Sequence, residues 1–222
     1  MARKPNEVYS WDITYLKSPI KGHYYYLYLI MDIFSRMIIG YRIEESENSE
    51  FAADLMDQCC IQQKIQKNQL TLHADNGGPM RGATMLATLQ SLGVIPSFSR
   101  PSVSDDNPFS EALFKTLKYR PSYPDGAFAS LEEAREWVRR FTGWYNTQHL
   151  HSGIKFVTPL SRHEGLDKAQ LERRHSIYEK AKLINPLRWS GKTRNWTHVT
   201  EVHLNPGKER RPDLQMLRNQ AA

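Results

Sequence analysis

The chain contains 222 residues, of which 40% are hydrophobic and 11% aromatic, so it can form one large domain or a core with a smaller appendage. Its two cysteines, Cys59 and Cys60, are adjacent and supply neither a disulfide framework nor the ligand spacing of a zinc site. The longest apolar run, residues 24–31, is too short to cross a bilayer, and the first residues carry no apolar signal segment. These features exclude a disulfide-rich secreted protein and a membrane-spanning one, and we expect a cytoplasmic protein.

The positive charge is concentrated in the last quarter of the chain. The net charge is +6, but residues 1–162 hold 18 Lys and Arg against 17 Asp and Glu, whereas residues 163–222 hold 12 against 7. A basic segment attached to an electrically balanced domain indicates a polyanionic partner, usually nucleic acid. The ordinary alternative is a solvated helical face.

Three strands are predicted near the start of the chain. Residues 7–16 alternate, with aromatic and apolar side chains on one face and Asp12 on the other. Residues 23–33 are apolar at both parities, which is typical of a central strand covered on both faces. A third strand over residues 37–43 follows after a short turn. Short connections between three successive strands predict an antiparallel meander.

Helical and strand patterns then alternate along the chain, because apolar residues recur at helical spacing between short apolar runs. The predicted elements are helix 49–66, strand 70–74, helix 81–92, strand 94–98, and helices 108–119 and 130–146. Together with the meander, they predict an α/β fold in which a mixed five-stranded sheet is flanked by helices.

The composition changes after Pro159. We place a domain boundary near Arg162, which divides the chain into a core over residues 1–162 and a basic extension over residues 163–222. The extension is predicted to contain a charged helix over residues 167–183 and a short strand in the alternating stretch HVTEVHLN.

Two aspartates occupy unusual positions in the predicted sheet. Asp12 lies in the middle of the first strand, where a carboxylate is costly to bury unless it is paired or bound to a metal. Asp75 is followed at once by the turn sequence Asn76-Gly77-Gly78-Pro79, so the chain leaves the strand directly after this acid. The glycines remove side chains where a phosphodiester backbone would approach.

A third acid, Glu111, lies in the segment DNPFSEALFKTLKYR. Asn107 suits the N-cap of this helix and Pro108 suits its first position. Glu111, Lys115 and Lys118 are spaced i, i+4 and i+7 and therefore share one face. This face presents a carboxylate near the helix start and two cations further along.

Each acid taken alone is most often structural, but the three together match the needs of a phosphoryl-transfer site. Asp12, Asp75 and Glu111 offer the hard oxygen ligands that Mg²⁺ prefers. Two such ions about 3.5–4 Å apart activate the nucleophile and stabilise the leaving oxygen of an in-line displacement. The pair His149 and His151 has a zinc-like i, i+2 spacing, but too few further ligands follow, so we favour a structural role for it.

Several segments resemble one known family. WDITYL, LIMDIFSRMIIGY, HADNGGPM and SRPSVSDDNPFSEALFKTLKYRP are similar to the integrase-type catalytic core of bacterial insertion-sequence transposases. These enzymes belong to the ribonuclease-H-like superfamily, which includes retroviral integrases. The resemblance covers residues 7–162. The tail RRHSIYEKAKLINPLRWSGKTRNW resembles the C-terminal extension of one insertion-sequence group.

The resemblance implies a fold, a reaction and a set of partners. It implies a ribonuclease-H-like sheet in which Asp12, Asp75 and Glu111 are catalytic and bind two Mg²⁺ or Mn²⁺ ions. It implies nicking of double-stranded DNA at element ends, followed by strand transfer of the freed 3′-hydroxyl into target DNA. It also implies a homo-oligomer on DNA, associated with the bacterial nucleoid, without a membrane or a small-molecule cofactor.

Six basic residues are predicted to contact DNA. Two match family positions near the active site, and four lie in the basic extension, where Trp189 and Trp196 interleave with the cations. They are Lys115, Lys118, Arg173, Arg174, Lys192 and Arg194.

Two other functions remain open from the sequence. One is a DNA-binding fragment without catalysis, and the other is a ribonuclease-H-like nuclease acting on RNA–DNA hybrids. The cationic face of the helix with Glu111 and the spacing of 35 residues between Asp75 and Glu111 favour the integrase branch. Because family members carry a helix-turn-helix region upstream of the core, we also expect poor sequence specificity from this chain alone.

Overall fold

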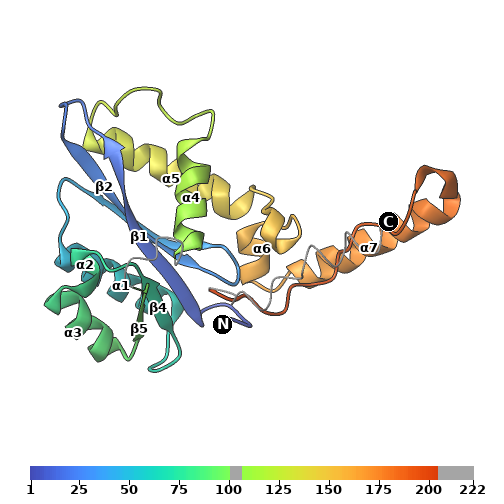
Figure 1. Ribbon diagram of the computed structural model, residues 1–222, viewed down its shortest axis with the longest axis horizontal. Helices are drawn as coiled ribbons and strands as arrows, with labels where there is room; N and C mark the ends of the chain where they lie inside the picture. Colours follow the sequence, from blue (N-terminus) through green and yellow to red (C-terminus); the bar gives the residue numbers. More distant parts are fainter. Residues whose placement is uncertain (101–106, 205–222) are drawn as a thin grey trace.

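The structure is a computed structural model that describes residues 1–100 and 107–204 (Figure 1). The strands are β1 (Val8–Lys17), β2 (Tyr24–Asp32), β3 (Ile38–Glu44), β4 (Thr71–Ala74) and β5 (Ile95–Phe98). The helices are α1 (Ser49–Gln63), α2 (Gly78–Arg81), α3 (Ala83–Leu92), α4 (Pro108–Lys118), α5 (Leu131–Thr147), α6 (Pro159–His163) and α7 (Asp167–Ile184). Two 3₁₀ turns, η2 (Ser152–Ile154) and η3 (Pro186–Arg188), complete the set.

The strands form one mixed five-stranded sheet in the order β3-β2-β1-β4-β5. The pairs β1–β2 and β2–β3 are antiparallel, whereas β1–β4 and β4–β5 are parallel. This arrangement confirms the predicted meander followed by alternating helices and strands. It also makes β1 the central strand, with a partner on each side.

Helices cover both faces of the sheet (Figure 1). On β2, Tyr28 and Ile30 pack into a cluster with side chains of α1 and α3, whereas Leu27 and Leu29 pack into a second cluster with α4 and α5. All four side chains are at most 1% exposed. The double-sided burial explains why this segment is apolar at both parities, since successive side chains of a strand point to opposite faces.

The predicted helix over residues 81–92 is wrong in one respect, because the chain forms two helices that meet at Gly82. Gly82 has extended backbone angles (φ −58°, ψ 141°) and joins α2 to α3. A Cβ at this position would lie 2.6 Å from the Cβ of Ser49, at the start of α1. The break therefore lets the chain pass close to α1, which helical periodicity alone does not reveal.

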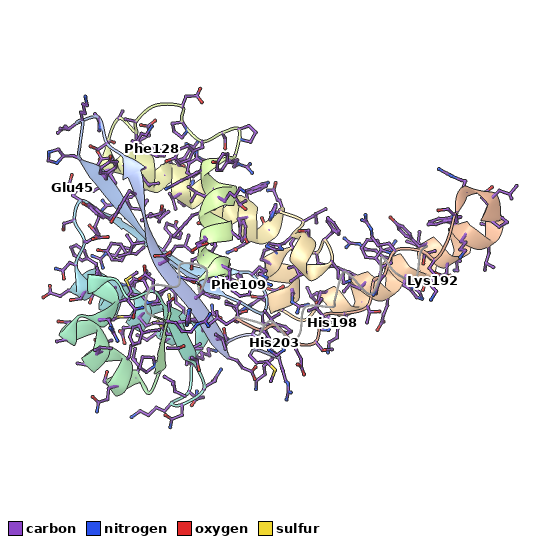
Figure 2. All side chains as sticks on the ribbon, viewed as in Figure 1. Glu45, Phe109, Phe128, Lys192, His198 and His203 are labelled. Carbon is purple, nitrogen blue, oxygen red and sulfur yellow. The ribbon has the colours of Figure 1, made fainter. Side chains whose placement is uncertain are left out.

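The basic extension begins with α7, which projects away from the core, and the chain then returns alongside it (Figure 1). Lys192 lies on the outer part of this return segment, and His198 lies nearer the core (Figure 2). The returning chain packs on the helix through Tyr178 and Trp196, whose ring centroids are 5.2 Å apart. We call α7 with residues 185–204 the arm.

The short strand predicted in HVTEVHLN is wrong for the part of it that the structure describes, residues 198–204. These residues form a single antiparallel bridge, in which the amides and carbonyls of Ala2 and Val202 exchange two hydrogen bonds of 2.8 Å. Next to this bridge, the amide of Arg3 points away from Val202 and donates to Glu7 Oε2, at 2.7 Å.

Contacts cross the domain boundary that we predict at Arg162. The buried Arg162 side chain lies in α6 and donates to the carbonyl oxygens of Phe34 and Val199, each at 2.7 Å. It therefore ties the sheet of the core to the end of the arm. The division of the chain at this residue stays a prediction. None of the described helices has the length and apolar character needed to cross a membrane.

Candidate active site

Pairing between β1 and β4 determines where Asp12 and Asp75 lie. The two strands are parallel, and Ser10 is paired with His73. Continuing this register by two residues puts Asp12 level with Asp75, which follows the last residue of β4. Neighbouring strands are about 4.8 Å apart, so the two acids emerge side by side at the same edge of the sheet.

The turn after β4 is built around the Asp75 carboxylate. Asp75 Oδ1 accepts a hydrogen bond from the amide of Gly77, at 2.9 Å. A Cβ on Gly77 would lie 2.9 Å from Met80 Sδ and 3.0 Å from Asp75 Oδ1, so this glycine makes room for the acid itself. A Cβ on Gly78 would meet nothing within 4 Å. The predicted clearance for a DNA backbone therefore concerns Gly78, and it stays a prediction.

Glu111 is carried by α4, whose faces differ as predicted. Leu113 and Leu117 are at most 2% exposed and pack into the core, whereas Glu111, Lys115 and Lys118 are exposed on another face. Partial burial lowers the pKa of Lys118. The helix thus holds a carboxylate and two amino groups outward from the core.

Asn107 is at the predicted N-cap position, but the predicted reason for it is wrong. Its side chain makes no capping hydrogen bond to α4. Instead, Asn107 Nδ2 donates to the carbonyl oxygen of Trp11, at 3.2 Å, and Asn107 Oδ1 accepts from Ser10 Oγ, at 2.5 Å. The asparagine therefore faces β1, where two polar groups compete with the helix amides for its side chain.

Electrostatics link Asp12 to both other acids. Burial is the largest cause that raises the pKa of Asp12 to about 7, and the 2.8 Å hydrogen bond from the amide of Ile13 opposes this rise. The negative charges of Asp75, Glu111 and Glu47 raise the pKa of Asp12 further. Within the described residues no ion pair involves Asp12, Asp75 or Glu111. Among residues 1–100 and 107–204, the three acids are therefore not neutralised by a direct ion pair.

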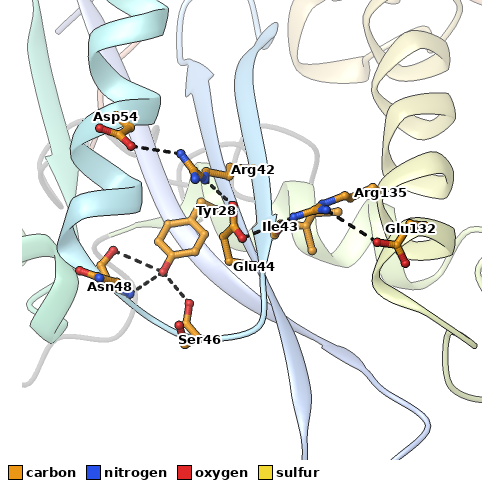
Figure 3. Close-up of polar contacts among 9 residues, drawn as sticks. All are labelled: Tyr28, Arg42, Ile43, Glu44, Ser46, Asn48, Asp54, Glu132 and Arg135. Atoms are coloured by element: carbon orange, nitrogen blue, oxygen red, sulfur yellow. Dashed lines mark hydrogen bonds and ion pairs between the residues drawn. The ribbon is translucent and has the colours of Figure 1, made fainter.

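Glu47 is a contributor that sequence reasoning missed. It lies in the loop between β3 and α1 and accepts a hydrogen bond from Tyr15 Oη, at 3.2 Å. Tyr28 holds this loop in place, because its hydroxyl donates to the carbonyl oxygen of Ser46, at 3.1 Å, and accepts from the amide of Asn48, at 2.7 Å (Figure 3). Glu47 influences Asp12 only because the loop folds toward it, so no local sequence pattern predicts this contribution.

The donor chemistry of the three acids suits a hard divalent cation, since carboxylate oxygens are the ligands of Mg²⁺. As the side chains stand, however, no three Asp, Glu, His or Cys side chains within residues 1–100 and 107–204 are gathered closely enough to hold one ion. The strand register places Asp12 level with Asp75, and Asp75 and Glu111 both raise the pKa of Asp12, so the three acids lie near one another although their oxygens do not converge on one point. Roles of Asp12, Asp75 and Glu111 as ligands stay a prediction.

His149 and His151 have a packing role in the described structure. Their ring centroids are 5.7 Å apart, and the ring of His149 stacks on Tyr145 at 5.2 Å. His151 Nδ1 accepts a hydrogen bond from the amide of Gly153, at 3.0 Å. The structural interpretation of this pair fits these contacts.

The four predicted DNA contacts of the arm differ in their surroundings. Arg174 donates to the carbonyl oxygens of Lys155 and Phe156, at 3.0 and 2.8 Å. Arg194 lies over the rings of Phe156 and Trp196, 5.0 and 5.6 Å from their centroids. Both arginines therefore help to build the arm, as does Trp196. Arg173, Lys192 and Arg194 are exposed, whereas Arg174 is half-buried.

Comparison with protein families assigns this arrangement of strands and acids to a class. Two family models, both described as integrase core domain, match residues 2–104 and residues 92–159. Residues 2–159 thus correspond to an integrase core along their whole length. The chain belongs to the integrase-core family, together with the transposases of bacterial insertion sequences.

Curated relatives are transposases of insertion sequences. The transposase of IS904 from Lactococcus lactis is 31% identical over 159 residues, which are 71% of this chain and 61% of that protein. The transposase InsF of IS3A from Escherichia coli is 30% identical over 71% of this chain and 54% of its own length. The chain therefore spans only part of the length of these relatives.

Solved structures show the same fold at low sequence identity. The simian T-cell lymphotropic virus intasome aligns with a TM-score of 0.56 and 17% identity, over 73% of this chain and 55% of the other. The HTLV-2 integrase catalytic core domain, determined in complex with magnesium, aligns with a TM-score of 0.52 and 18% identity, over 73% of this chain and 99% of the other. This likeness confirms the predicted ribonuclease-H-like sheet.

Proposed function

We propose that this chain is a DNA transposase core that nicks the ends of a mobile element and transfers the freed 3′-hydroxyl into target DNA. The observation that carries the proposal is the coupling of Asp12 to Asp75 and Glu111, which come from β1, from the end of β4 and from α4. A bound cation would relieve the repulsion among these carboxylates, and it would also let a negatively charged phosphate approach them.

The reaction consists of two displacements at phosphorus. In the first, a water oxygen bonds to phosphorus as the bond to the 3′-oxygen breaks, which leaves a 3′-hydroxyl and a 5′-phosphate. In the second, that 3′-oxygen bonds to a target phosphorus as the target's own 3′-oxygen leaves. Two Mg²⁺ or Mn²⁺ ions, when bound, would polarise the attacking and leaving oxygens. In this proposal Asp12, Asp75 and Glu111 hold these ions.

Double-stranded DNA is the proposed partner, both as element end and as target. Lys115 and Lys118 share the exposed face of Glu111, so phosphates beside the reacting one would meet them. The exposed Arg173 and Lys192 would add contacts from the arm, while Arg174 and Arg194 would act mainly by holding the arm together. We further propose assembly as a homo-oligomer on DNA, at the bacterial nucleoid in the cytoplasm.

A strand-transfer assay tests the proposal. The full chain is incubated with Mg²⁺ or Mn²⁺, a labelled duplex with a recessed 3′-hydroxyl and a supercoiled plasmid, alongside a labelled RNA–DNA hybrid. We expect label in the plasmid with the native chain and none with Asp75→Asn. Asp125→Asn is the matched control, because Asp125 is exposed in the loop between α4 and α5.

The other functions are outcomes of the same assay. Cleavage of the hybrid without strand transfer would replace the proposal with a ribonuclease-H-like nuclease. DNA binding without chemistry in either metal would replace it with a non-catalytic fragment.

A further inference from the structure

A buried polar cluster lies between β1 and the start of α4. It consists of Ser10, Asn107 and Ser110, which are 0%, 3% and 0% exposed. Side chains of this kind are costly to bury unless they are hydrogen-bonded, so their presence at a helix–sheet contact calls for a reason. We call this cluster the β1–α4 clamp.

Three side-chain contacts close the clamp. Ser10 Oγ donates to Asn107 Oδ1, at 2.5 Å, and lies 2.6 Å from Ser110 Oγ. Asn107 Nδ2 donates to the carbonyl oxygen of Trp11, at 3.2 Å. Every polar side chain of the clamp thus has a partner, and each contact joins β1 to α4. The contacts span 96 to 100 residues of sequence.

The clamp lies directly beside two of the acids. Ser10 precedes Asp12 by two residues on β1, so the two side chains point to the same face of the strand. Ser110 immediately precedes Glu111 on α4. The clamp therefore joins the two elements within two residues of each carboxylate.

Apolar packing does not provide the same restraint. Leu113 and Leu117 bury the inner face of α4 in the core. Contacts between apolar side chains lack direction, whereas hydrogen bonds depend steeply on distance and angle. The apolar contacts of Leu113 and Leu117 therefore restrain the position of α4 along its axis less sharply than hydrogen bonds do. The clamp determines how far along β1 the helix begins.

We propose that Asn107, together with Ser10 and Ser110, is a positioning residue that holds the start of α4 against β1, so that Glu111 can share a divalent cation with Asp12. This inference rests on the proposed function. Asn107 uses its side chain for β1 although it occupies the N-cap position, where an asparagine ordinarily bonds to the helix amides. The clamp thus takes precedence over a local stabilising contact.

Mn²⁺ binding to the full chain, followed by electron paramagnetic resonance without DNA, tests the inference. We expect Asn107→Ala to weaken Mn²⁺ binding about tenfold, which is the lower end of the effect of removing a group that orients a metal ligand. Ser110→Ala removes only one hydroxyl and should also weaken Mn²⁺ binding. It replaces Asn107→Ala in this test if that variant does not fold.

Asn146→Ala is the matched control. Asn146 also joins a helix to a strand, since its side chain donates to the carbonyl oxygen of Ile38 and accepts from the amide of Ile38, both at 2.9 Å. Asn146→Ala should lower the melting temperature about as much as Asn107→Ala does, but it should bind Mn²⁺ as the native chain does. Equal Mn²⁺ binding by Asn107→Ala and the native chain would overturn the inference.

A double-mutant cycle separates positioning from general loosening. In a Glu111→Gln background, Asn107→Ala should have little further effect on Mn²⁺ binding, because the residue acts through Glu111. An undiminished tenfold effect in that background would contradict positioning. If the native chain binds no Mn²⁺, the proposed function itself fails. If the native chain and the Asn107→Ala variant bind Mn²⁺ equally well, only the positioning role is refuted.

Discussion

Arg162 Nη1 lies 3.1 Å from Asp167 Oδ2, and the two side chains are only 0% and 2% exposed. The same guanidinium lies over the ring of Phe34, 4.0 Å from its centroid. His198 Nε2 lies 2.9 Å from the same oxygen of Asp167. The base of the arm is therefore fixed to the core by a buried ion pair with neighbours from two other parts of the chain, at Phe34 and at His198.

This pair predicts a large stability effect. Arg162→Met keeps the bulk of the stem but removes the guanidinium from the buried Asp167, which then keeps its contact with His198 and loses its cationic partner, so the free energy of unfolding should fall by about 3–5 kcal/mol. Urea denaturation measures this loss. Arg139→Met is the control, because Arg139 pairs with Glu136 on the surface at 65% and 48% exposure, where solvent screening leaves a pair little effect on stability. Equal losses in the two variants would refute a special role for the buried pair.

Replacement of Gly77 and of Gly78 by alanine should have different effects on the Asp75 carboxylate. Gly77→Ala puts a methyl group 3.0 Å from Asp75 Oδ1, so the carboxylate must move and strand transfer should fall by at least about tenfold. Gly78→Ala meets no protein atom within 4 Å and should leave the stability close to that of the native chain. Rates with the recessed duplex and melting temperatures measure both effects. If DNA must approach within a methyl group of Gly78, only the transfer rate of Gly78→Ala will fall.

His151 predicts a dependence of stability on pH. Burial, followed by the positive charges of Arg36 and His149, lowers the pKa of His151 to about 4 from its ordinary 6.5. The unfolded chain therefore takes up this proton first as the pH falls. The contribution to stability is complete above about pH 6.5, declines between pH 6.5 and 4, and levels off below.

His151→Asn removes the titrating group and retains an acceptor for the amide of Gly153. The free energy of unfolding, measured by urea denaturation at several pH values, should fall less steeply between pH 6.5 and 4 in this variant. His23→Asn is the control, since His23 is exposed in the turn between β1 and β2. Parallel curves for native chain and His151→Asn would contradict the burial argument.

Substitutions of the basic residues of the arm should fall into two kinds, those that weaken DNA binding alone and those that also lower the melting temperature. Arg173→Ala and Lys192→Ala remove exposed cations, so each should weaken DNA binding with little change in melting temperature and lower the slope of log affinity against log salt by about 1. Arg194→Ala removes contacts with Phe156 and Trp196 and should also lower the melting temperature. Fluorescence anisotropy across a salt series measures the slopes. Lys21→Ala, in the turn between β1 and β2, should change neither quantity.

The sequence by itself determined the sheet and the helix that carries Glu111. Alternation along residues 7–16 and double-sided apolarity along residues 23–33 predict β1 and β2 correctly, because the period of a strand is local and its burial leaves a direct imprint. The apolar spacing at Leu113 and Leu117 likewise predicts α4. Family motifs then suggest which acids to examine.

Only the tertiary structure decided how these elements meet. The break at Gly82 depends on the approach of Ser49, and the use of Asn107 depends on Ser10, which is 97 residues away in sequence. Glu47 reaches Asp12 only through the fold of its loop, and Arg162 finds Phe34 across 128 residues. A periodic pattern records which face of an element is buried, but it does not record which distant side chain covers that face, since the partner is chosen by the packing of the whole chain.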